Sequence, residues 1–377
     1  MVVRGDNMIN ITNGLTFDDV LLAPKFSKIQ TRKAIDLSVD LSKNISFKHP
    51  IIPANMKTVT ELDMAKITHS MGGMAILHRF MSWEEQVKML IEVKNLPDGV
   101  FYIGFSVGVK EEDYKKVDYF AENKVRILCI DIAHGDSEQC VAMTTYIAEK
   151  YPHIFLIAGN IATGTGAERL WKAGADCVKV GIGPGSLCTT RIETGNGVPQ
   201  LTALSDVYDM RQQLTTPTQS FQQPAWDDPD VSFGHMVQNA PEITKPIFII
   251  ADGGIKAAGD IVKALCFADM IMAGNLFAGT KETPGTVLNV SGERSTKHYK
   301  RYEGSSTHKT NHIEGVSAVV PYKGPVKDVM IKLCEGVSSG LSYQGCNNLK
   351  SLRSDPQFIR ITNAGLKESH PHDVTVA

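Results

Sequence analysis

The residue best suited to covalent chemistry is Cys188, which lies in the glycine-rich segment GIGPGSLCTTRIETGNGVPQ at 181–200. Glycines in such a segment let the backbone approach a ligand closely, and the loop's amides and carbonyls can bind ions. A cysteine on a loop of this kind is a nucleophile when its thiolate is stabilised. Ser186 adds a hydroxyl suited to a phosphate oxygen. From these residues alone, a structural cysteine on a tight turn is the stronger alternative.

Two further glycine-bearing segments follow later apolar runs: Asp252-Gly253-Gly254 and Gly274-Asn275. In barrels of alternating strands and helices, the loops after the last two strands commonly bind phosphate through backbone N–H groups. Each segment taken singly is equally consistent with ordinary turn glycines. The sequence has neither a Walker A motif nor a GxGxxG fingerprint, so a nicotinamide cofactor would have to bind by another geometry.

Short, β-branched apolar runs recur along the chain and alternate with segments of helical periodicity, such as the one that aligns Trp83, Leu90 and Val93 on one face. Continuous apolar runs suit strands that are buried on both faces, as in a parallel sheet. Eight of them predict a single (β/α)₈ TIM barrel, an α/β fold, with a doubly wound open sheet as the alternative. The expected strands are 49–54, 73–78, 101–108, 125–133, 154–160, 176–183, 246–254 and 268–275.

Three segments interrupt this alternation within the one domain expected over 1–377. Residues 208–245 are rich in Gln, Pro, Thr and Asp, and we interpret them as a loop inserted between strands six and seven, beside the site or toward a neighbouring subunit. Residues 284–324, which follow strand eight, are interpreted as a flap region. Residues 366–377 are expected to be a mobile tail.

The composition excludes several classes of protein. The chain has 377 residues, of which 42% are hydrophobic and 21% charged, with a formal net charge of −2, so a basic nucleic-acid binder is not indicated. No run of 18 apolar residues occurs, and the first residues lack the apolar core of a secretory signal. Seven scattered cysteines without a CxxC pair argue against a disulfide framework. We therefore expect a cytoplasmic enzyme with no nucleic-acid or membrane partner.

Five motifs carry a family resemblance: LTFDDVLLAP (15–24), GIGPGSLCTTR (181–191), ADGGIK (251–256), AGN (273–275) and IEGVSAVVPYKG (313–324). Together they resemble the IMP dehydrogenase/GMP reductase family, from about residue 14 to about residue 365. The resemblance implies a (β/α)₈ barrel that assembles as a homotetramer. It also implies that Cys188 is the catalytic nucleophile.

The chain is more similar to the reductase branch of that family. Dehydrogenases usually carry regulatory (CBS) domains between an early barrel helix and the next strand, and residues 82–108 leave no room for them. They also need an Arg-Tyr pair in the flap to activate water, which is missing between Gly304 and Glu314. The Arg301-Tyr302 pair lies upstream, where the family has a substrate-binding turn. The alternatives are a dehydrogenase without regulatory domains, a reductase with altered purine specificity such as for a deoxynucleotide, and a silent nucleotide-binding relative.

The reductase resemblance implies that GMP and NADPH are converted to IMP, ammonia and NADP⁺. Cys188 would attack C2 of the purine, ammonia would leave, and hydride would reduce the thioimidate adduct. Thr190 would act with Glu314 in proton transfer to the departing ammonia, because a hydroxyl is a poor acid without a carboxyl that exchanges protons with it. Retention of all three residues argues against a silent relative.

The remaining site residues are implied by the same resemblance. Positions that match substrate contacts are Asn55, Met56, Ser186, Asp252, Gly253, Gly254, Gly274, Asn275, Gly304, Ser305, Ser306 and Gly315. Positions that match the NADPH site are Arg79, Asp131, Ile132, Ala133, Ile182, Gly183, Ser339, Gly340, Leu341 and Ser342. A potassium (K⁺) site matches the carbonyls of Gly183, Gly185 and Cys188, with Arg191.

Overall fold

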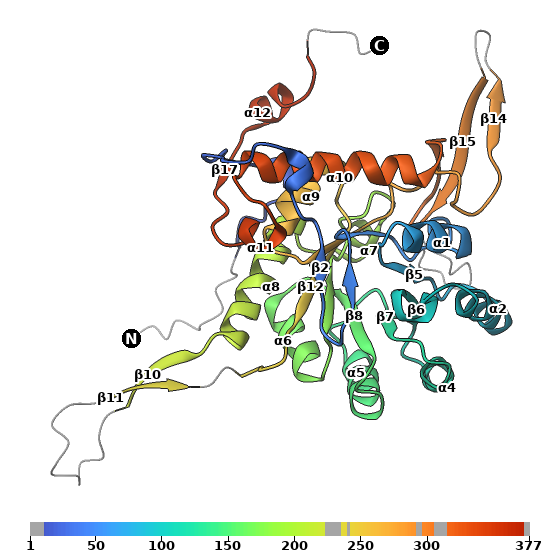
Figure 1. Ribbon diagram of the computed structural model, residues 1–377, viewed down its shortest axis with the longest axis horizontal. Coiled ribbons are helices and arrows are strands. Elements are labelled where there is room, and N and C mark those ends of the chain that lie inside the picture. Colours follow the sequence, from blue (N-terminus) through green and yellow to red (C-terminus); the bar gives the residue numbers. More distant parts are fainter. Residues whose placement is uncertain (1–10, 223–234, 240–241, 292–295, 305–314, 373–377) are drawn as a thin grey trace, which may run out of the picture.

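Eight parallel strands form the central sheet of the computed structural model, which describes residues 11–222, 235–239, 242–291, 296–304 and 315–372. The two outermost strands of the ladder, β4 and β5, also contact each other, so the sheet is nearly closed into a barrel (Figure 1). In sheet order the strands are β4 (Ile51–Pro53), β13 (Met270–Ala273), β12 (Phe248–Asp252), β9 (Cys177–Val180), β8 (Phe155–Ile161), β7 (Ile127–Asp131), β6 (Ile103–Val107) and β5 (Ala75–Leu77).

A helix that packs around the outside of the barrel follows each strand in the chain. In α2, Ser82 caps the first turn together with Glu85, and Leu90 and Val93 are buried. The predicted (β/α)₈ barrel is confirmed. Seven of the eight expected apolar runs contain a strand of the barrel, and β8 extends one residue beyond the remaining run, 154–160. The helices are α1 (Leu62–Ser70), α2 (Trp83–Lys94), α4 (Glu111–Glu122), α5 (Glu138–Lys150), α6 (Gly164–Lys172), α8 (Gln200–Thr215), α9 (Ala258–Leu265) and α10 (Val326–Tyr343).

Short elements cover the ends of the barrel. Strand β1 (Val20–Leu22) pairs with β17 (Phe358–Arg360), which joins the two ends of the described chain. None of the described helices is both long enough and apolar enough to span a membrane. The other short elements are β2 (Val39–Asp40), β3 (Ser46–Phe47), α3 (Gly99–Tyr102), α7 (Thr190–Thr194), α11 (Leu349–Leu352), α12 (Asn363–Glu368) and 3₁₀ turns at Phe17–Asp19 and Arg32–Ala34.

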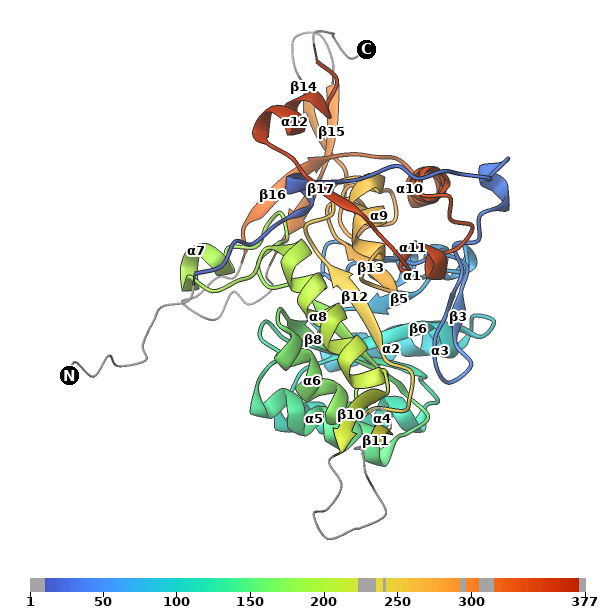
Figure 2. The same cartoon turned by 90° about the vertical axis from the view of Figure 1, so that its left-hand side faces the viewer.

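The segment 208–245 differs from the loop that the sequence predicts. Helix α8 continues through its first residues to Thr215, because Val207, Arg211 and Leu214 lie on a buried face. Strands β10 (Thr218–Gln222) and β11 (His235–Asn239) then form an antiparallel hairpin. The hairpin leaves the barrel at the amino end of β12, at the bottom of Figure 2, so it does not project beside the carboxyl ends of the strands.

The flap region 284–324 also contains regular structure that the sequence analysis did not predict. Strands β14 (Leu288–Ser291), β15 (Thr296–Glu303) and β16 (Ser317–Pro321) form an antiparallel sheet. Alternate residues of β15 face inward, and the buried Lys300 ammonium donates to backbone carbonyls of Thr280 and Lys281. The apolar pattern was missed because the inward positions include a lysine. In the predicted mobile tail, residues 366–368 belong to helix α12, and residues 373–377 lie outside the described chain.

A buried ion pair fixes α8 to the sheet. One carboxylate oxygen of Asp269 accepts hydrogen bonds from Arg211 Nη1 at 2.7 Å and from the backbone N–H of Ile249 at 2.9 Å. The other oxygen lies 3.5 Å from Arg353 Nη2. Asp269 therefore connects helix α8, strand β12 and the C-terminal segment.

We expect Asp269→Ala to lower the free energy of unfolding by about 3–5 kcal/mol, because it leaves the Arg211 guanidinium buried without its partner. Urea unfolding followed by the fluorescence of the buried Trp171 measures the loss. The matched control is Asp355→Ala, which removes an exposed pair with Lys25 and should cost at most about 1 kcal/mol. Equal losses in the two variants would contradict the structural role of Asp269.

Candidate active site

A cavity of about 320 Å³ opens at the carboxyl ends of the barrel strands. Because the strands are parallel, the residues that follow each of them meet at this end. The cavity brings together most of the site residues that the sequence predicts. Those that line it are Asn55, Met56, Arg79, Asp131, Ile132, Ala133, Ile182, Gly183, Gly185, Cys188, Thr190, Asp252, Gly253, Gly274 and Gly304.

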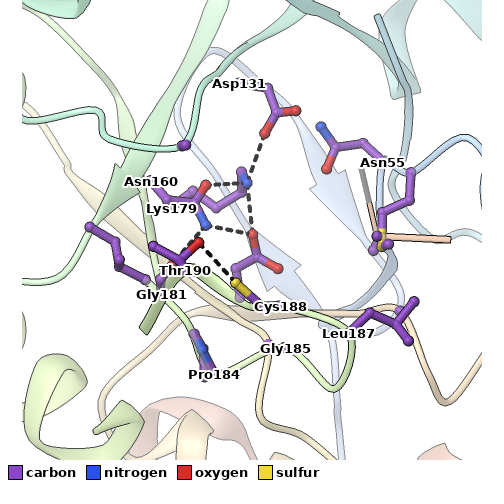
Figure 3. Close-up of a pocket in the computed structure, with 18 of the residues that line it drawn as sticks. Asn55, Asp131, Asn160, Lys179, Gly181, Pro184, Gly185, Leu187, Cys188 and Thr190 are labelled. Atoms are coloured by element: carbon purple, nitrogen blue, oxygen red, sulfur yellow. Dashed lines mark hydrogen bonds and ion pairs between the residues drawn. The ribbon is translucent and has the colours of Figure 1, made fainter. Parts of the chain in front are cut away.

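Cys188 is held on the loop that follows β9, and its thiol is half-buried in the cavity wall. The thiol donates to Thr190 Oγ1 at 3.1 Å (Figure 3). The backbone N–H of Cys188 donates to the carbonyl of Gly185 at 3.1 Å, which closes a tight turn before the cysteine. A nucleophile and a hydroxyl that can relay a proton are therefore adjacent in the cavity.

The start of this loop depends on close packing between β9 and β12. Gly181 has a φ of +154°, and a Cβ atom on it would lie 2.0 Å from the carbonyl oxygen of Asp252. The buried Gln200 amide donates to the carbonyls of Val180 at 2.8 Å and Asp252 at 3.3 Å. Glycine and glutamine therefore fix the distance between the cysteine loop and the Asp252-Gly253-Gly254 turn.

The floor of the cavity holds a buried charge cluster built on Lys179 of β9. Lys179 Nζ lies 3.0 Å from Asp131 Oδ1 and 2.7 Å from Asp252 Oδ2, and its side chain is 3% exposed (Figure 3). Asn160 Nδ2 also donates to Asp252 Oδ2, at 2.9 Å. Burial alone would lower the pKa of Lys179, but the two carboxylates raise it above its ordinary value. Burial would likewise raise the pKa of Asp131, yet the Lys179 ammonium holds that pKa below its usual range.

Around this floor, side chains from several strand ends shape the cavity. Arg79, after β5, donates from Nε to the backbone carbonyl of Asp131 at 2.8 Å. Asn55, after β4, donates to Ser106 Oγ at 2.8 Å. Tyr302 of β15 is 4% exposed and lines the cavity, and its hydroxyl lies 4.0 Å from Met56 Sδ. The flap sheet therefore contributes directly to the cavity wall.

Backbone hydrogen bonds connect the flap to the cysteine loop. The N–H of Val316 donates to the carbonyl of Leu187 at 3.1 Å, and the N–H of Gly304 donates to the carbonyl of Val316 at 3.2 Å. Gly315 is packed against Gly304, and Gly304 also lies beside Leu187, the residue that precedes Cys188. The predicted site residues Ser305, Ser306 and Glu314 lie outside the described residues.

Several predicted residues do not line the cavity. Ser186, Gly254 and Asn275 each follow a lining residue directly. The four predicted cofactor positions on α10 are elsewhere on the barrel, where Leu341 is buried in the core and Gly340 packs against Val262. The positions on α10 are Ser339, Gly340, Leu341 and Ser342.

Of the three carbonyls predicted to bind potassium, that of Gly185 accepts the backbone N–H of Cys188 at 3.1 Å. Arg191 packs its side chain against Gly183 and donates to the carbonyls of Ile182 at 3.2 Å and Val198 at 2.5 Å. Its guanidinium thus satisfies neighbouring carbonyls of the same loop. Carbonyl oxygens suit a hard monovalent cation. Within the described ranges, no group of three or more His, Cys, Asp or Glu side chains is placed to hold a metal ion.

Sequence reasoning missed three polar side chains that line the cavity: Asn160, Lys179 and Tyr302. A lysine inside the apolar run 176–183 was the available signal, since a charge in a strand that is buried on both faces needs a partner. Tyr302 was not predicted because the Arg301-Tyr302 pair lies upstream of the segment in which a water-activating pair is expected. Nothing in the sequence distinguishes Asn160 from an ordinary strand-end residue.

The geometry of the site agrees with a comparison against protein families. The model of the IMP dehydrogenase / GMP reductase domain matches residues 14–220 and 234–372. The chain belongs to the IMP dehydrogenase/GMP reductase family. Members of this family are oxidoreductases that act on purine nucleoside monophosphates with a nicotinamide cofactor. The match breaks only at 221–233, so the departure from the family begins at the end of β10 and stops before β11, and does not cover the whole of 208–245.

The relatives similar to this chain include proteins named GMP reductase and proteins named inosine-5'-monophosphate dehydrogenase. GMP reductase of Lactobacillus gasseri is 36% identical over 346 residues, which cover 89% of this chain and 92% of that protein. Inosine-5'-monophosphate dehydrogenase of Borreliella burgdorferi is 34% identical over 424 residues, which cover 96% and 97%. The dehydrogenase of Cryptosporidium parvum is 32% identical over 423 residues, which cover 97% of each chain. These two dehydrogenases are little longer than this chain, so its lack of a regulatory insertion does not separate the two reactions.

We expect iodoacetamide at pH 7 to alkylate Cys188 before any other cysteine. Five of the others are buried, and burial raises the pKa of the half-buried Cys334 thiol to about 11. At pH 7 such a thiol is ionised to only about one part in 10⁴, so it should react slowly. Peptide mass spectrometry after short exposure measures the order of labelling. Labelling of Cys334 at the same rate as Cys188 would contradict the accessibility described here.

Proposed function

We propose that this chain is an NADPH-dependent GMP reductase, which converts GMP to IMP and ammonia. The observation that carries the proposal is the orientation of the Arg301-Tyr302 pair. Adjacent residues of a strand point to opposite faces. Accordingly, Tyr302 lies in the cavity wall, whereas the Arg301 side chain is 71% exposed and lies 3.9 Å from Glu303. This pair cannot act jointly on a water molecule in the cavity, and the sequence between Gly304 and Glu314 contains no other Arg-Tyr pair.

In the proposed reaction, Cys188 forms a bond to C2 of the purine. The amino group on C2 then leaves as ammonia, with a proton passed through Thr190 and Glu314. The 3.1 Å contact between Cys188 and Thr190 supports this assignment, since a proton donor must lie within reach of the reacting atom. A reduced nicotinamide, when bound, supplies hydride to C2. The carbon–sulfur bond then breaks, which regenerates the Cys188 thiolate and releases IMP.

The cavity has groups suited to both ligands. Asp252, at the end of β12, is proposed to accept hydrogen bonds from the ribose of GMP. The residues proposed to bind its phosphate are Ser186, Gly254, Gly274 and Asn275. On the other side, the Asp131 carboxylate fits the hydroxyls of the nicotinamide ribose, with the Arg79 cation beside it. The K⁺ site on the cysteine loop and a homotetrameric assembly are part of the same proposal and are supported by the family resemblance. A cytoplasmic location is also proposed, because the seven scattered cysteines form no CxxC pair.

An altered purine specificity has less support. Two features favour it, the inserted segment 208–245 and a flap that is short for a reductase. The β10–β11 hairpin of the inserted segment leaves the barrel at the end opposite the cavity. The dehydrogenase alternative differs in one chemical requirement, a base that deprotonates water. His308 and His312 are the imidazoles that the flap sequence offers for that task, and both lie outside the described residues.

The first test compares the two directions with the same purified protein. GMP with NADPH should be consumed, while IMP with NAD⁺ should react more slowly by about 10²–10⁴-fold, the range that general base catalysis contributes. Absorbance at 340 nm follows both reactions, and chromatography identifies the nucleotide product. Formation of xanthosine monophosphate at a rate comparable with GMP reduction would make the chain a dehydrogenase.

A second test isolates the proton transfer assigned to Glu314. We expect Glu314→Gln to slow the release of ammonia from GMP by about 10²-fold or more, while it leaves hydride exchange between IMP and NADPH nearly unchanged. Single-turnover ammonia release and isotope exchange at C2 measure the two steps. The control is Glu303→Gln, on the neighbouring strand. Equal slowing of both steps in Glu314→Gln would assign that residue to positioning of the flap.

A further inference from the structure

The Lys179 ammonium connects two carboxylates that belong to different halves of the cavity. Asp131 ends strand β7, Asp252 ends strand β12, and Lys179 comes from β9, so one side chain reaches across the barrel floor. The Lys179 ammonium also donates to the side-chain amide oxygen of Asn160, Oδ1. Each of the three ammonium hydrogens therefore has an acceptor. The position of this cation is therefore determined by three strands at once.

When two carboxylates share one buried cation, the strength of each ion pair depends on the strength of the other. Removing a charged group from water is costly, and the cost is offset only by close partners. A hydrogen bond that a ligand donates to one carboxylate spreads the negative charge of that carboxylate and weakens its hold on the ammonium. The ammonium then attracts the second carboxylate more strongly. The effect is large in a site of low polarity, where charges interact more strongly than in water.

We propose that Lys179 is a positioning residue that couples nucleotide binding at Asp252 to cofactor binding at Asp131. The assignment of the two carboxylates to the two ligands rests on the proposed function. When a ribose hydroxyl donates to Asp252, Lys179 holds Asp131 more firmly in the orientation that accepts the hydroxyls of the cofactor. By thermodynamic linkage, the cofactor tightens nucleotide binding by the same factor.

The experiment measures binding without turnover, using GMP and NADP⁺, a pair that cannot exchange hydride. Calorimetric titration gives the Kd of NADP⁺ with and without saturating GMP. In the wild-type protein we expect GMP to lower that Kd by about fivefold or more, which is the lower end of typical coupling between sites. In Lys179→Met the ratio should fall to about 1, and Lys179→Arg, which keeps the charge, should restore part of it. Full coupling in Lys179→Met would overturn the proposal.

A second variant covers the case in which Lys179→Met fails to fold with two unpaired carboxylates. Asp131→Asn leaves the 2.7 Å pair between Lys179 and Asp252 intact but removes the second charge. It should still bind GMP and lose the coupling; retained coupling would contradict the proposal. If the wild-type protein binds both ligands without coupling, the role proposed for Lys179 is wrong, while the proposed function is not contradicted. A wild-type protein that binds neither would contradict the proposed function.

Discussion

The close approach of β9 to β12 is the constraint on which the site depends. At Gly181 the two strand ends are so near that any side chain would collide with the Asp252 carbonyl. Gln200 bridges the same two strand ends from the start of α8. This contact sets the Cys188 loop against the Asp252-Gly253-Gly254 turn, so the nucleophile and the proposed ribose and phosphate contacts are fixed relative to each other by the barrel itself.

Two further connections extend that arrangement across the cavity. Below it, Lys179 joins Asp252 to Asp131 and so relates the two proposed ligand halves. Above it, the backbone bond between Val316 and Leu187 attaches the flap to the cysteine loop. In the proposed reaction, a flap that is hydrogen-bonded to the Cys188 loop can determine which molecule reaches the Cys188–purine adduct, while the barrel stays the same. Relatives named for two different reactions match this chain over most of its length.

The barrel could be predicted from the sequence because its strands are buried on both faces and appear as continuous apolar runs. The cysteine loop could be predicted because its glycines directly follow such a run. Local patterns failed where burial involves charged residues, as at Arg211 in α8 and Lys300 in β15. They also could not show that Lys179 meets carboxylates from β7 and β12, since such pairing depends on the order of the strands in the sheet. The four positions on α10 were matched to the cofactor site by sequence alone, and the fold places them outside the cavity.

The central claim is that Cys188 forms a covalent bond to the purine during turnover. Acid quenching of the protein with GMP and NADPH, followed by peptide mass spectrometry, tests it most directly. The account predicts that the Cys188 peptide gains the mass of GMP less ammonia, and that Cys188→Ala shows neither this adduct nor turnover while it still binds GMP. Turnover by Cys188→Ala at a rate near that of the wild type would contradict the account.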